Sequence, residues 1–142
     1  MYLRAACIAV LLASLSACGG DGGPAVSGVV GVNSGSNYAN VHTPDGGYLG
    51  DHAPSAACIG AGQNGDAQPG ALVTFFGADN NIVGTAKLEV GHMQTVGNAE
   101  FCVMPFESKL NKKSDAYQAQ FGQAAKATVD PGNLKNLVLN AS

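Results

Sequence analysis

A polar stretch in the N-terminal half of the chain concentrates side chains that could do chemistry. It holds two histidines, two aspartates and two tyrosines: His42, Asp45, Asp51, His52, Tyr38 and Tyr48. Imidazoles and carboxylates ligate zinc and also act as general bases and acids. The spacing matches no established metal motif, and polar loops collect such residues without any function. We therefore interpret residues 33–57 as a candidate binding loop, in which His42 and His52 are weak metal candidates.

A second set offers the soft ligands that copper prefers. It consists of His92, Met93, Cys102 and Met104. A blue-copper site would need a histidine shortly after its cysteine, and none follows Cys102. His92 is thus only a weak metal candidate, and Met104 is more simply explained as a core residue.

Motifs for catalysis are missing from the sequence. There is no Gly-x-Ser-x-Gly elbow, no phosphate-binding loop and no Cys-x-x-Cys pair. The sequence therefore predicts no catalytic residue, no cofactor and no enzyme, and a hydrolase ranks third among the functions we consider.

The N-terminal segment bears on where the protein is located. A basic start, Met1–Arg4, precedes the apolar run Ala5–Ala13, and Leu15-Ser16-Ala17-Cys18 follows. This arrangement resembles the signal peptide and lipobox of bacterial lipoproteins. The resemblance implies a signal peptide at 1–17, cleavage before Cys18, and a diacylglycerol on the Cys18 sulfur. Two or three acyl chains would hold the protein stably on a membrane. An ordinary cleaved signal remains the alternative, since small residues also precede that site.

Residues 18–25 then form the acylated cysteine and a flexible tether, Gly19-Gly20-Asp21-Gly22-Gly23-Pro24. In enteric bacteria an aspartate directly after the acylated cysteine retains a lipoprotein in the inner membrane. Gly19 occupies that place here. We therefore expect an extracytoplasmic protein, lipid-anchored to the cell membrane or the outer membrane.

The lipoprotein resemblance also limits the cysteine chemistry. Cys7 would be discarded with the signal peptide and Cys18 would be acylated, which leaves Cys58 and Cys102. An exported protein meets an oxidising compartment, so we expect these two to form a disulfide. Closing a loop of about 45 residues would stabilise the fold by roughly 4 kcal/mol.

Composition indicates one lean domain. The chain has 142 residues, of which 46% are hydrophobic, with 20 glycines, no tryptophan and only 12% charged residues. Its formal charge of −3 becomes more negative once Arg4 is removed. Net charge therefore draws the chain neither to nucleic acid nor to anionic lipid. Lys109, Lys112 and Lys113 could dock an acidic partner, although a solvated loop is the simpler interpretation.

Alternating apolar residues predict short strands. The expected strands are Ala25–Val32, Ala71–Phe76, Ile82–Val90, Ala99–Phe106, Tyr117–Phe121, Ala125–Val129 and Asn136–Asn140. These predict an all-β fold, a small antiparallel β-sandwich of six to seven strands, immunoglobulin- or prealbumin-like, over residues 26–142.

The pattern also assigns faces. The run Ala71–Phe76 is nearly all apolar, so we expect a central strand covered on both faces. In the next strand Ala86, Leu88 and Val90 should point inward, and after Gly91–Gly97 the side chains of Cys102, Met104 and Phe106 should share one side. A helix over 114–126 competes with the strand at Tyr117–Phe121, because Ala, Gln and Lys favour helices.

The C-terminal part also resembles a family. The matching segments are Cys58, Gly70–Phe75, Ile82-Val83-Gly84-Thr85, Cys102–Phe106 and Tyr117–Gly122. Together they are similar to small exported proteins of mycobacteria and other actinobacteria. The resemblance implies a compact β-sandwich with one disulfide and no established activity.

These observations favour a membrane-anchored extracytoplasmic lipoprotein with a non-catalytic domain that binds an unidentified protein or other envelope partner. The alternative is a lipoprotein that binds a small ligand or a metal through the loop 33–57.

Overall fold

The computed structural model describes residues 22–49 and 55–141. The predicted signal peptide and Cys18 lie outside this range, and so do Asp51 and His52 of the candidate loop. Within it, no helix has the length and apolar character needed to cross a bilayer.

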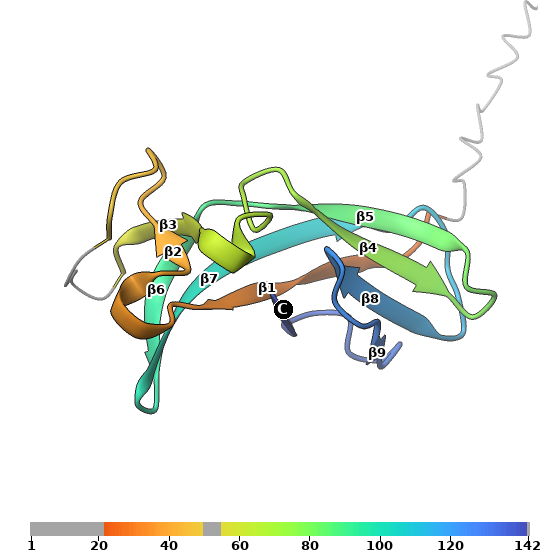
Figure 1. Cartoon of the computed structure of the whole chain (residues 1–142). Helices are drawn as coiled ribbons and strands as arrows, with labels where there is room; N and C mark the ends of the chain where they lie inside the picture. Colours follow the sequence, from red (N-terminus) through yellow and green to blue (C-terminus); the bar gives the residue numbers. More distant parts are fainter. Residues whose placement is uncertain (1–21, 50–54, 142) are drawn as a thin grey trace, which may run out of the picture.

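The described chain is all-β, with ten strands and two short 3-10 helices and no α-helix (Figure 1). The strands are β1 Ala25–Asn33, β2 Val41–His42, β3 Ala57–Gly60, β4 Leu72–Gly77, β5 Ile82–Leu88, β6 Gly91–Val96, β7 Ala99–Lys109, β8 Tyr117–Phe121, β9 Ala127–Val129 and β10 Leu137–Asn140. The helices are η1 Ser36–Tyr38 and η2 Gly62–Asn64. All ten strands belong to one curled sheet. The predicted all-β class is confirmed. The predicted β-sandwich of six to seven strands is not confirmed, because the ten described strands belong to one sheet.

β7 is the central strand of the sheet. One edge pairs antiparallel with β1 along the whole length of β1, from Asn33 opposite Phe101 to Ala25 opposite Lys109. The other edge is shared, because β6 pairs with its first half and β5 with Phe106 and Glu107. From β5 the sheet continues through β4 and β8 to β9, and from β6 through β3 to β2. β10 runs parallel to β1.

The predicted alternation of β7 is confirmed. Cys102, Met104 and Phe106 are buried, while Phe101 and Val103 on the opposite face are half-buried. The buried face meets β4, where the Phe75 ring packs edge-on against Phe106 with ring centroids 6.2 Å apart. The core is therefore enclosed where the sheet curls over itself.

A strand at Tyr117–Phe121 is confirmed against the helical alternative, because Tyr117, Ala119 and Phe121 are all buried on one face of β8. The Tyr117 hydroxyl accepts a hydrogen bond from the Ser114 backbone N–H at 2.7 Å. A tyrosine that begins a strand and binds backbone a few residues upstream resembles the tyrosine corner of β-sandwich domains. It fixes the turn that enters β8.

Two predicted faces are wrong. Val90 is 37% exposed, because β5 ends at Leu88 and the chain then turns away from the core. β4 is fully buried on one face only: Val73 and Phe75 are buried, whereas on the other face Thr74 and Phe76 are half-buried and Leu72 is 47% exposed. A run of apolar residues does not distinguish a strand with two covered faces from one with apolar residues facing solvent.

Three short strands, β2, β3 and β6, are not predicted by the sequence pattern. β6 occupies the segment between Gly91 and Gly97 that we expected to be a connection, and its only large side chain facing the core is Met93. It forms a tight hairpin with β7, in which Val96 pairs with Ala99.

The predicted disulfide is confirmed. Cys58 of β3 is bonded to Cys102 of β7, with Cα atoms 5.9 Å apart. The bond passes over β6, the strand that lies between them, at the position where Cys58 pairs with Gly91. A Cβ atom on Gly91 would lie 2.6 Å from the Cys102 sulfur. A glycine is thus required at this crossing.

Candidate functional site

The sheet has two distinct ends, joined by β1 and β7 (Figure 1). The tether end comprises Gly22–Pro24, the β4–β5 turn at 78–81 and the loop 110–116. The loop end comprises 33–49, 55–66 and the β6–β7 hairpin. β1 has nine residues, and the eight steps between them, at about 3.3 Å each, separate the two ends by roughly 26 Å.

Backbone hydrogen bonds fasten the candidate loop at the loop end to the sheet. The Ser34 N–H donates to the Glu100 carbonyl of β7 at 3.0 Å, and the Asn40 carbonyl accepts from the Ala61 N–H at 2.8 Å. The Tyr38 hydroxyl also donates to the Glu100 carboxylate. Tyr38 is therefore part of the loop's support, and its hydroxyl does not extend freely toward a ligand.

The next segment closes a polar turn. The Thr43 N–H donates to the Gly47 carbonyl at 3.0 Å, and the Gly46 N–H donates back to Thr43 at 2.8 Å. The Thr43 hydroxyl donates to the Asp45 carboxylate. This bond, followed by the Gly47 N–H, lowers the pKa of Asp45 below its ordinary value. Asp45 thus acts as the acceptor that holds its own turn.

His42 and Tyr48 face each other across this turn through an isolated β-bridge. The His42 side chain is half-buried, whereas Tyr48 is 66% exposed. The structure therefore brings three of the six predicted loop residues, His42, Asp45 and Tyr48, onto one short ribbon. Tyr38 lies against Glu100 instead, and Asp51 and His52 lie outside the described residues.

His92 lies on the same sheet face as His42, but not beside it. His42 pairs with Ile59 of β3, and two residues earlier in β3 Ala57 pairs with His92 of β6. The two histidines are thus two strand spacings apart, roughly 10 Å, in addition to their offset along the strands. In residues 22–49 and 55–141 no three histidine, cysteine or acidic side chains gather as a metal site would require. The metal hypothesis for the loop remains a prediction, since it includes Asp51 and His52.

The soft ligands considered for copper do not converge. Met93 and Met104 are buried on the core face of β6 and β7, whereas His92 is exposed on the other face. The Cys102 sulfur is bonded to Cys58. These four residues therefore form no common ligand set.

An open groove of about 470 Å³ crosses the outer face of β1, β7 and β10. Its lining includes Val29, Pro105 and Val138 together with the carboxylates of Glu89 and Glu107. Val138 is 72% exposed. Alternation along each strand indicates that these side chains face outward. The groove itself could not be predicted, because strands that are far apart in the sequence form it.

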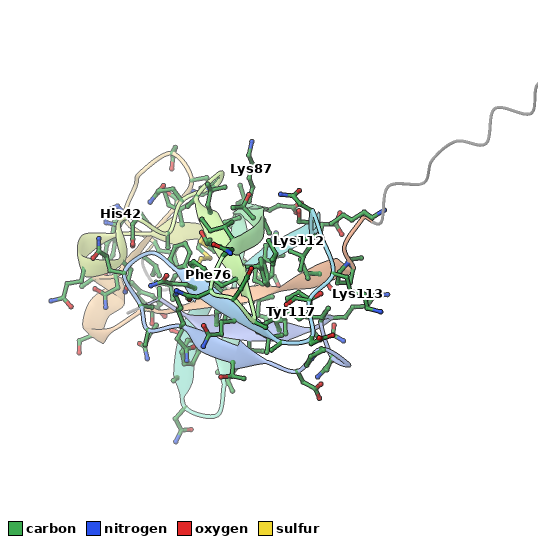
Figure 2. All side chains as sticks on the ribbon, turned by 90° about the vertical axis from the view of Figure 1, so that its right-hand side faces the viewer. His42, Phe76, Lys87, Lys112, Lys113 and Tyr117 are labelled. Carbon is green, nitrogen blue, oxygen red and sulfur yellow. A yellow bond between two sulfur atoms is a disulfide. The ribbon has the colours of Figure 1, made fainter. Side chains whose placement is uncertain are left out.

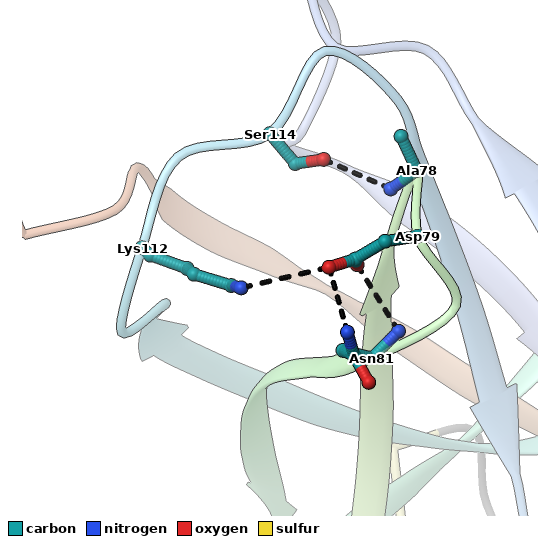
Figure 3. A network of polar contacts seen from close by, with 5 residues as sticks. All are labelled: Ala78, Asp79, Asn81, Lys112 and Ser114. Carbon is teal, nitrogen blue, oxygen red and sulfur yellow. Dashed lines mark hydrogen bonds and ion pairs between the residues drawn. The ribbon is translucent and has the colours of Figure 1, made fainter.

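A polar network occupies the tether end (Figure 3). The Asp79 carboxylate accepts from the Asn81 side chain at 2.7 Å and from the Asn81 N–H at 3.1 Å. These bonds lower the pKa of Asp79, with a smaller contribution from the Lys112 ammonium at 3.9 Å. The Ser114 hydroxyl accepts from the Ala78 N–H at 2.9 Å and thereby joins the β4–β5 turn to the loop 110–116.

Comparisons with protein-family models, with curated proteins and with solved structures found no match. The resemblances to bacterial lipoproteins and to small actinobacterial exported proteins therefore remain predictions from the sequence.

Proposed function

We propose that this chain is an extracytoplasmic lipoprotein, anchored through acylated Cys18, whose non-catalytic β domain presents the loop end to a partner in the cell envelope. The observation that carries the proposal is the opposition of the two ends. The first strand, β1, begins at Ala25, only seven residues after the cysteine of the predicted lipobox. The loop end lies at the other end of β1 (Figure 1).

Two further features support this assignment. The Cys58–Cys102 disulfide suits an exported protein, because reducing cytosol disfavours such bonds. The curled sheet also carries a tyrosine corner, which favours a sandwich-like interaction module of the kind found in many surface proteins. We propose binding rather than catalysis because the largest described hollows are open grooves rather than enclosed pockets with convergent polar groups.

The partner surface proposed at the loop end is centred on the ribbon of His42, Asp45 and Tyr48. It combines an exposed aromatic ring with polar groups, a composition that is typical of interaction surfaces. The ribbon is supported by the loop's hydrogen bonds to β7, so it would meet a partner as a preformed structure.

Metabolic labelling with a radioactive fatty acid tests the anchor. We expect the wild-type protein to incorporate label and to fractionate with membranes, and Cys18→Ala to lose both properties. The matched control is Cys7→Ala, which alters a cysteine in the discarded segment and should leave labelling unchanged. Label that persists in Cys18→Ala would refute the lipoprotein assignment.

The loop-end surface has its own test. Crosslinking in intact cells from a photoreactive residue at Tyr48 should capture one envelope component, and the same residue at Ile82 of β5, which is 60% exposed, should not capture it. Equal capture from both positions would refute a partner surface at the loop end.

A further inference from the structure

Four exposed lysines surround the point at which the chain enters the sheet. We call them the lysine collar: Lys109, Lys112, Lys113 and Lys135. Lys109 pairs with Ala25, the first residue of β1. Lys113 lines a hollow together with Gly22 and Pro24, and Lys135 lines another with Ala25 and Val26.

The collar is fixed relative to the entering chain by backbone contacts. The Leu110 N–H donates to the Pro24 carbonyl at 3.0 Å. A Cβ atom on Gly23 would lie only 2.5 Å from the Lys112 carbonyl oxygen, so the two backbones pass in direct contact. The residues that emerge toward Cys18 therefore leave the body beside the collar lysines.

Charge is distributed unevenly between the two ends. The described residues of the loop end contain no lysine or arginine, but they do contain Asp45, Asp66 and Glu100. At the tether end Asp79, Asp115 and Glu107 offset part of the collar's charge, and Asp79 is already engaged by Asn81 and Lys112. Among the described residues, the lysines thus gather at the tether end beside several acidic side chains, whereas the loop end has acidic side chains and no lysine or arginine.

The lipid anchor would bring the collar to the membrane. Four peptide units from Cys18 to Gly22 span at most about 14 Å, so the collar would stand at the level of the phospholipid head groups. Each lysine near an anionic surface gains favourable energy that screening by salt removes. We propose that the lysine collar binds anionic phospholipid head groups and so orients the loop end away from the membrane. This inference depends on the lipid anchor of the proposed function.

Lysine-selective acylation followed by mass spectrometry tests the inference on the lipidated protein in vesicles. In phosphatidylcholine mixed with phosphatidylglycerol, we expect labelling of the collar lysines to fall roughly fivefold relative to pure phosphatidylcholine. Salt at about 1 M, where the Debye length is about 3 Å, should restore the labelling. Val96→Lys places a lysine at a position that is 63% exposed in the β6–β7 hairpin of the loop end and serves as the internal control. Lys87 does not serve, because it pairs with Glu107, two residues from Lys109, although it lies apart from Lys112 and Lys113 in Figure 2.

A variant pair extends the test. Lys112→Gln with Lys113→Gln should raise the labelling of Lys109 and Lys135 toward the level seen in pure phosphatidylcholine. Gln94→Glu with Thr95→Glu lowers the net charge by the same two units at exposed positions of the loop end and should leave the protection intact. Melting curves of both variants would show that each is folded.

The possible outcomes distinguish failure of the collar inference from failure of the proposed lipid anchor. Protein that floats with both kinds of vesicle while its collar is labelled equally in both would overturn the inference and leave the anchor standing. Protein that carries no lipid and floats with neither would overturn the proposed function and the inference together. Protection of the collar by a soluble polyglutamate in phosphatidylcholine vesicles, without protection by phosphatidylglycerol, would assign the collar to an acidic protein partner instead.

Discussion

At the tether end the backbone is held by long strands and hydrogen bonds, whereas at the loop end short strands depend on a covalent bond. β1 and β7 pair as far as Ala25 and Lys109, and the tyrosine corner of Tyr117 fixes the neighbouring turn. β2 and β3 contain two and four residues, and in the described chain their strand pairing with the rest of the sheet runs through β6. So few ladder hydrogen bonds offset little of the conformational entropy that these segments lose on folding. The Cys58–Cys102 bond supplies the missing constraint at the end proposed to meet a partner.

Among the variants that compare the two ends, removal of the disulfide should cause the largest loss of stability. For Cys58→Ala with Cys102→Ala we expect the free energy of unfolding to fall by roughly 4 kcal/mol, because the sequence separation of 44 closes a long loop. Denaturant unfolding measures the loss. Hydrogen exchange should rise first in β2 and β3, and faster exchange in β8 than in β3 would contradict the proposed division of the molecule.

A smaller loss of stability is expected from a substitution where the disulfide crosses β6. Gly91→Ala would place a Cβ atom 2.6 Å from the Cys102 sulfur, so we expect a loss of about 1–3 kcal/mol from overpacking.

Gly31→Ala is the matched control for that crossing, because the nearest heavy atom to its Cβ would be 3.5 Å away. Its stability should change by less than about 1 kcal/mol. Equal losses in the two variants, measured by denaturant unfolding, would show that the crossing is no tighter than an ordinary strand position.

At the tether end the corresponding test is Tyr117→Phe. It removes the acceptor of the Ser114 N–H from a side chain that is only 2% exposed, and we expect a loss of about 1 kcal/mol. Thr85→Val removes a hydroxyl from an exposed position of β5 and should change stability by less than about 0.5 kcal/mol. An unchanged melting temperature for Tyr117→Phe would remove the tyrosine corner from the account.

The smallest effect concerns one aspartate at each end. Asp45 and Asp79 both have pKa values lowered from 3.8 by hydrogen bonds to their charged forms. Each carboxylate therefore stabilises the folded state above that value, and the contribution disappears as the pH falls through the lower folded pKa. Carboxyl chemical shifts followed by NMR should give both midpoints below 3.8. A midpoint at or above that value for Asp45 would contradict the closed turn at the loop end.

Local pattern was sufficient to predict the strands outside the loop end, although not every face of β4 and β5. The alternation in β7 and β8 reads directly from the sequence, because three alternate residues of each strand are buried on one face. The strand β6 was not predicted, because its only large core-facing side chain is Met93, which lies between Gly91 and Gly97. β2 and β3 are too short to show a period. Val90 was placed inward because the sequence does not show that β5 ends two residues earlier.

The candidate site was harder to predict than the fold. The residues of the loop were identified, but the contact of Tyr38 with Glu100 joins positions 62 residues apart and has no local signal. Three collar lysines, Lys109, Lys112 and Lys113, were identified from the sequence as possible contacts of an acidic partner, but Lys135 and their position beside the tether were not. A net charge of −3 suggested no attraction to anionic lipid, because a sum over the chain does not show that folding gathers four of the lysines at one end.

The most direct test of the account is the intact mass of the protein extracted from the membranes of its own cells. The account predicts a polypeptide that begins at Cys18 and carries a diacylglycerol on that residue, with Cys58 and Cys102 unreactive toward thiol reagents until reduction. An unmodified chain that begins at Met1, recovered from the cytosol with both thiols free, would contradict it.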